Sequence, residues 1–132
     1  MFLNNLDKNE KIAFLNLAHY LARSDGDFSE KQKEIINTYC YEMNIDDIEF
    51  DENNFNIDLV LKSIKNKKSQ KIVLLEVMAL VYSDNILHPE EEKVINLMLD
   101  IFGIEKNVAS LYGEWTKAIM ALSEQGKLLI EI

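Results

Sequence analysis

The sequence predicts an all-α fold, a single-domain helical bundle of about six helices over residues 1–132. Apolar residues recur at the three- and four-residue spacing of a helix face along most of the chain. Residues that cap helix N-termini precede several of these apolar segments. The chain has only one Pro and four Gly, so little interrupts its helical segments.

In the first half of the chain, two helices are expected on either side of an acidic turn. Asp7 can cap the first helix, which should end near Ser24. Ser29 followed three residues later by Gln32 forms a capping-box pattern. We therefore expect a second helix from this point to about Met43.

The next part of the chain is organised around its most apolar segment. A polar, acidic connection over 44–56 leads to a short helix over 57–66. Ser69 is expected to cap the central helix, in which Glu76 is the only polar residue over 72–82. A helix this apolar must be buried on most sides. Glu76 is expected to reach solvent or pair with a lysine, and a buried carboxylate is the alternative.

Two more helices are expected after a second acidic turn. Pro89 suits the first position of a helix, and Gly103 should end that helix. A last helix is expected over 105–124, stopped by Gly126, and the apolar tail 127–132 should dock on the body or pair as a strand with a partner. The residues of the last helix expected to face the body are Val108, Leu111, Tyr112, Trp115, Ile119 and Leu122.

The two helix–acidic turn–helix segments are similar in sequence. Residues 15–45 align without a gap on residues 74–104, at an offset of 59, with seven identities in 31 positions. Average amino-acid usage would give roughly two. The identical pairs are Leu15/Leu74, Leu21/Leu80, Ser24/Ser83, Asp25/Asp84, Ile36/Ile95, Asn37/Asn96 and Ile45/Ile104. We therefore expect two pseudo-symmetric units, at about 12–45 and 71–104, followed by a C-terminal helix and tail at 105–132.

Composition and charge limit the classes of function. Cys40 has no second cysteine to pair with, which suits a reducing compartment. The start lacks a basic segment followed by an apolar core, and the longest apolar run is about half of the roughly 20 residues that span a bilayer. A cytoplasmic protein without a transmembrane segment is expected. The net charge of −9 disfavours nucleic acid and favours a cation or a basic protein surface as partner.

The two acidic turns share a motif. An apolar helix runs into A-x-x-D-G-x-(apolar)-S-x-x-E/Q and then into another helix, as ARSDGDFSEKQ at 22–32. The second copy, VYSDNILHPEE at 81–91, departs from this pattern with Asn85 for the glycine and His88 for the serine. This duplicated pattern resembles the TerB-like family, which includes the tellurite-resistance TerB proteins and related N-terminal domains of some membrane-anchored J-domain co-chaperones. That family usually has Glu seven residues after the aspartate. Glu91 keeps this residue, and Gln32 departs from it.

The resemblance implies an all-α bacterial cytoplasmic protein that is linked to stress responses and is not an enzyme. It also implies a protein partner at a membrane-associated complex, and a divalent cation such as calcium bound by acidic residues near the turns. The candidate metal ligands are Asp25, Asp27, Asp84 and Glu91. Because calcium takes about six to eight oxygen ligands, such a site requires the two turns to converge or water to complete the shell.

Other interpretations stay open. Asp25 and Asp84 are also explained as turn formers, whose carboxylates accept backbone N–H groups. The apolar segment 115–132 is compatible with an interaction module, such as a homodimer. A carboxylate-based metal hydrolase using Asp25, Asp84 and Glu91 is a further alternative, which requires both turns to line one cleft.

Overall fold

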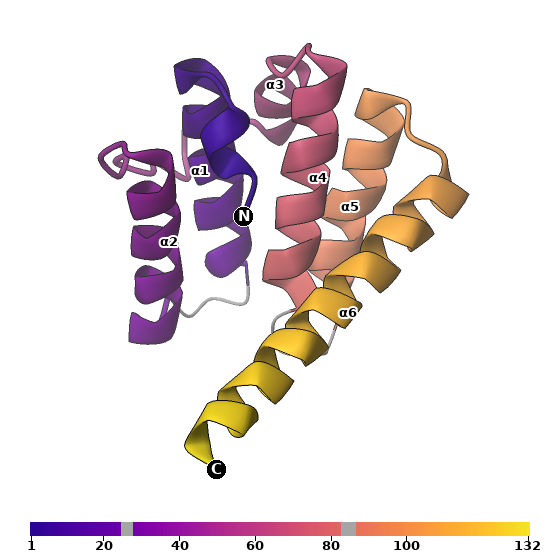
Figure 1. Ribbon diagram of the computed structural model, residues 1–132. Helices are drawn as coiled ribbons and strands as arrows, with labels where there is room; N and C mark the ends of the chain where they lie inside the picture. The colour runs from indigo at the N-terminus through magenta and orange to yellow at the C-terminus, as the bar shows by residue number, and fades with distance from the viewer. Residues whose placement is uncertain (25–27, 83–86) are drawn as a thin grey trace.

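The computed structural model describes residues 1–24, 28–82 and 87–132, and the regular secondary structure in these ranges is entirely helical (Figure 1). The elements are a short 3-10 turn, η1 (Leu3–Asn5), and the helices α1 (Lys8–Ala22), α2 (Glu30–Met43), α3 (Ile57–Lys62), α4 (Lys67–Val81), α5 (Pro89–Phe102) and α6 (Lys106–Glu131). The expected all-α bundle is confirmed for the described part of the chain. No helix in these ranges is both long and apolar enough to cross a bilayer.

Helix α4 lies at the centre of the bundle. It contacts α1, α5, α6 and η1, while α1 also packs against α2 and α3 (Figure 1). The α4 residues that are buried are Ser69, Gln70, Ile72, Val73, Leu74, Glu76, Val77, Met78 and Val81. Nine of its 15 residues are thus buried, as the apolar composition of this segment predicts.

Side-chain caps fix where the helices begin. The backbone N–H of Glu10 donates to Asp7 Oδ1 at 2.8 Å, and Ser29 forms the expected capping box with Gln32. The expected cap of α4 is wrong. Asn66 caps this helix, because its Oδ1 accepts the backbone N–H of Ser69 at 3.1 Å, and Ser69 itself is a buried residue of the first turn.

The helix bounds recur at the offset found in the sequence. Helices α1 and α4 begin and end at positions 59 apart, and so do α2 and α5. Asn44 and Gly103 follow α2 and α5 in the left-handed conformation, with φ of 55° and 67°. Ile45 and Ile104 then donate to carbonyl groups of the helix that precedes them. The repeat therefore extends to the helix ends; pseudo-symmetry of the two units in space stays a prediction.

The C-terminal helix differs most from the expectations. Helix α6 continues through Gly126 to Glu131, so residues 127–131 are helical and neither dock on the body nor form a strand. Gly126 does not stop the helix, because glycine costs only about 1 kcal/mol relative to alanine in a helix interior. This cost is small beside the helical preference of the residues around it.

The face by which α6 packs agrees only in part with the expected one, because Tyr112 packs against the core and Trp115 contacts Phe2 as expected. Its buried residues are Ala109, Gly113 and Thr116, whereas Leu111 and Leu122 are 69% and 62% exposed. A Cβ atom added at Gly113 would lie 3.6 Å from the ring of Tyr82, which shows how closely the helix approaches the body there. Small residues line this contact and Tyr112 packs against the core beside them, whereas Leu111 and Leu122 lie on the outer side.

Glu76 is buried in α4, which corrects the expectation that it reaches solvent or pairs with a lysine. Its side chain is 7% exposed, and Oε1 accepts hydrogen bonds of 2.8 Å from the Met1 ammonium and from the backbone N–H of Phe2. Glu42 on α2 accepts from the same ammonium and from the backbone N–H of Leu3, each at 3.0 Å. The two carboxylates thereby hold the N-terminal segment against α2 and α4.

The charges in this cluster affect one another. Burial alone would lower the pKa of the Met1 ammonium, but its hydrogen bonds to Glu76 and Glu42 outweigh burial and raise the pKa above its ordinary value. Tyr39 lies near the same carboxylates, and burial together with their negative charge raises the pKa of its phenol. The phenol stays neutral and the ammonium stays charged at neutral pH.

Candidate functional site

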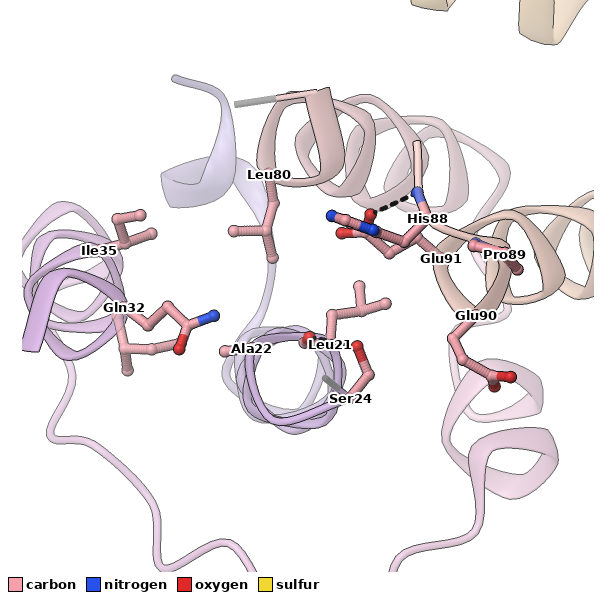
Figure 2. A pocket seen from close by; sticks show the side chains of 11 residues that line it. Leu21, Ala22, Ser24, Gln32, Ile35, Leu80, His88, Pro89, Glu90 and Glu91 are labelled. Atoms are coloured by element: carbon pink, nitrogen blue, oxygen red, sulfur yellow. Dashed lines mark hydrogen bonds between the residues drawn. The ribbon is translucent and has the colours of Figure 1, made fainter. Parts of the chain in front are cut away.

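A pocket of about 330 Å³ lies where the end of α1, the start of α2, the end of α4 and the start of α5 meet (Figure 2). We call it the interhelical pocket. It is lined by Leu21, Ala22, Ser24, Gln32, Ile35, Ile36, Leu80, His88, Pro89, Glu90 and Glu91. Figure 2 shows Leu80 of α4 pointing toward Leu21 of α1, with α2 on one side of them and the start of α5 on the other.

Of the four candidate metal ligands, Glu91 is the one that the structure describes. Asp25, Asp27 and Asp84 lie outside the described residues. Glu91 is in the first turn of α5, where its Oε1 accepts the backbone N–H of His88 at 3.0 Å (Figure 2). This carboxylate therefore fixes the start of α5 and also lines the interhelical pocket.

The described residues that flank the two acidic turns meet in this pocket. Ser24, which directly precedes Asp25, lines it from the end of α1. His88 and Glu91, which follow the second turn, line it from the start of α5. The sequence left open whether the two units approach each other at their turns. In the structure, the end of α1 in the first unit and the start of α5 in the second unit border one cavity.

The chemical character of the pocket is apolar with a polar rim. Leu21, Ile36 and Leu80 supply apolar surface from three different helices. The hydroxyl of Ser24 donates to the carbonyl of Leu21 at 2.8 Å, so it serves the end of α1. Among the residues that the structure describes, no group of three His, Cys, Asp or Glu side chains is placed to hold a metal ion.

A second polar cluster was not predicted from the sequence. His19 of α1 is 3% exposed, and its Nε2 lies 2.8 Å from Oδ1 of Asp47 in the acidic connection. The ring of Phe50 stacks on His19 with centroids 5.7 Å apart, and the Arg23 guanidinium lies 3.9 Å from the centre of the Phe28 ring. The sequence feature that could have indicated this cluster is His19, a polar residue on the apolar face of its helix. The cluster fastens the acidic connection to α1.

Cys40 lies close to the same acidic connection. Burial and the negative charge of Asp47 raise the pKa of its thiol to about 11. A cysteine nucleophile needs the opposite, a pKa lowered by a nearby cation or a helix N-terminus. A thiol with a pKa raised in this way is protonated at neutral pH.

The fold and the interhelical pocket define a helical protein with a small apolar cavity, lined by residues that flank the two acidic turns in the sequence. No family model, no curated protein and no solved structure matches the chain. The resemblance to the TerB-like family stays a prediction from the motif at 22–32 and 81–91.

Proposed function

We propose that the protein is a non-catalytic, TerB-like binding protein of the bacterial cytoplasm that receives a basic and apolar segment of a partner protein in the interhelical pocket. The observation that carries the proposal is the meeting of both helix–turn–helix units at this pocket. Its wall offers apolar surface, and its rim includes Ser24 and His88, which flank the two acidic turns in the sequence.

The dimensions of the pocket favour side chains of a partner over a large ligand. A volume of about 330 Å³ is at the lower end of the range for small-molecule sites. Burial of one Leu, Ile or Phe side chain there would contribute roughly 1.5–3 kcal/mol. Basic residues next to that side chain would be attracted by the net charge of −9 and by the acidic residues of the turns.

A labelled model peptide of alternating Lys and Leu tests this proposal by fluorescence anisotropy. Ile35 lines the pocket, and Ile35→Lys should weaken peptide binding by about tenfold or more because it adds a like charge and removes apolar surface. Leu59 on α3 is 66% exposed and outside the pocket, so Leu59→Lys is the matched control. Equal weakening by both variants would mean unspecific charge attraction, and unchanged binding to Ile35→Lys would refute the proposal.

A divalent cation is the second candidate ligand, with Asp25, Asp27, Asp84 and Glu91 as its proposed carboxylate ligands. The observation that favours it is that the described flanks of both turns border one pocket. Calcium has the required preference for several oxygen ligands, so neither turn would bind it alone.

Calorimetric titration of the metal-stripped protein with calcium tests the second candidate. Saturable heat that is lost in both Asp25→Asn and Asp84→Asn would support a single shared site. A flat titration, with the two variants changed only in stability, would identify these aspartates as turn formers and remove the cation. Glu91→Gln separates the two functions of Glu91, because the amide oxygen still accepts the N–H of His88 but no longer carries charge.

A further inference from the structure

The outer face of α6 carries an apolar stripe with one polar position. Its members are Leu111, Trp115, Ala118, Leu122, Gln125, Leu129 and Ile132, and we call them the seam. Their spacing alternates between four and three residues, which is the heptad pattern of a coiled-coil interface, with Gln125 as its polar member. The seam does not include Ala109, Gly113 and Thr116, by which α6 packs on the body, and Trp115 at its edge also contacts Phe2, with ring centroids 6.1 Å apart.

The seam is exposed and extends beyond the bundle. Leu122, Leu129 and Ile132 are 62%, 71% and 99% exposed. The C-terminal turns of α6 continue past the ends of the other helices (Figure 1). The 15 residues from 118 to 132 correspond to about 22 Å of helix, or four turns. A partner can therefore approach this part of α6 without meeting the rest of the molecule.

The charge of this region identifies the kind of partner. Residues 106–132 contain three Lys and three Glu and no other charged side chains, so their net charge is zero. The whole net charge of −9 therefore lies in residues 1–105. A second copy of the chain would be repelled by that part of the molecule but not by α6. A strongly basic partner, in contrast, would be drawn to the body and not to the seam.

We infer that the seam binds a second copy of this chain, with two α6 helices packed antiparallel in a reversible homodimer. A stripe that runs along one helix is complementary to itself under a two-fold axis. Antiparallel packing places the two acidic bodies at opposite ends of the helix pair, whereas parallel packing would place them side by side. The inference is independent of the interhelical pocket and goes beyond the proposed function.

The available area agrees with a reversible dimer. The large seam side chains Leu111, Trp115, Leu122, Leu129 and Ile132 are 40–99% exposed. At roughly 100 Å² of apolar surface each, two copies would bury on the order of 1,000 Å². This area is at the low end for specific complexes, so dissociation in the micromolar range is expected.

Sedimentation equilibrium over a range of micromolar to millimolar concentrations tests the inference. The wild-type chain should change from a mass of 15.3 kDa to twice that value as concentration rises. The double variant Leu122→Glu and Leu129→Glu should raise the dissociation constant by about a hundredfold or more, because it buries two charges in the seam. Far-UV circular dichroism should show unchanged helix content in this variant, since both residues are exposed in the monomer.

The matched control is the double variant Ser123→Glu and Lys127→Gln, which changes the net charge by the same amount at exposed positions of α6 outside the seam. It should dimerise like the wild-type chain. A wild-type chain that stays monomeric at all concentrations, or a seam variant that still dimerises, would overturn the inference. Sedimentation of a monomeric chain with phosphatidylcholine vesicles would also overturn it, since lipid would then be the occupant of the seam.

Discussion

The buried carboxylate of Glu76 provides a direct test of how the N-terminal segment is held. We predict that Glu76→Gln lowers the free energy of unfolding by about 1–2 kcal/mol at neutral pH. The carboxylate accepts two hydrogen bonds of 2.8 Å, and the one from the Met1 ammonium depends most on its charge. Hydrogen bonds to charged groups contribute about 1.5–3 kcal/mol, and we take the lower part of that range because Met1 is 53% exposed.

The predicted change is measurable by thermal unfolding. An entropy of about 2.1 cal/mol/K per residue gives about 0.28 kcal/mol/K for 132 residues. A loss of 1–2 kcal/mol should therefore lower Tm by about 4–7 °C. Glu124→Gln is the matched control, because Glu124 is 72% exposed and pairs with the exposed Lys127, so its Tm should change by about 1 °C or less.

The same pair predicts how stability depends on pH. The pKa of the Met1 ammonium is raised in the folded protein, so the pair stabilises the fold fully below the ordinary value of about 8 and less as pH rises through the raised pKa. The free energy of unfolding should therefore fall above about pH 8 in the wild-type chain, and less steeply in Glu76→Gln. Urea unfolding at a series of pH values measures this slope. Equal slopes in the two proteins, or an unchanged Tm in the variant, would refute the reasoning.

Three further predictions concern the core and the helix starts. At pH 7 about one Cys40 side chain in 10⁴ is a thiolate, so the reaction of Cys40 with a thiol-specific disulfide reagent should be slow. The reaction should be faster in Asp47→Asn, because the negative charge of Asp47 raises the pKa of the thiol. Equal reaction rates in the wild-type chain and the variant would contradict the described pKa. Asn66→Ala should cost about 1 kcal/mol in urea unfolding and Ser69→Ala clearly less, whereas the reverse order would restore Ser69 as the cap of α4. Leu74→Ala should cost about 2–5 kcal/mol, since Leu74 is fully buried in α4, and a loss below 1 kcal/mol would contradict its central position.

Helix boundaries were predictable from the sequence where the signals are local. The caps of α1 and α2 and the end of α5 at Gly103 follow from neighbouring residues, and the structure has each of them as expected. Asn66 was missed although it lies 59 positions after Asp7, which caps α1. If the alignment of the two units had been extended back to the start of the first helix, Asn66 would have been aligned with Asp7 and identified as a cap. No local sequence pattern could identify the partner of Glu76, because Met1 is 75 positions away.

In the C-terminal helix, the spacing of apolar residues does not correctly predict which side chains are buried. The pattern placed Leu111, Tyr112 and Leu122 toward the body, but of these only Tyr112 packs against the core, while Leu111 and Leu122 are exposed. The closest approach to the body is made by Ala109 and Gly113. The sequence pattern shows which faces of a helix are apolar. It does not show which of these faces packs against the rest of the protein. The candidate site was predictable to the same degree: Glu91 could be named from its motif, whereas its position beside Leu21 and Ser24 depends on how the helices pack.

The anchoring of residues 1–6 has a consequence for the order of folding during synthesis. Leu3 is fully buried, yet the groups that hold its neighbours in place include Glu76, which leaves the ribosome much later. At about 5–20 residues per second, the intervening 75 residues take roughly 4–15 s to translate. For that time Leu3 has no completed site to enter, so the earliest part of this region to be made is among the last to reach its native place.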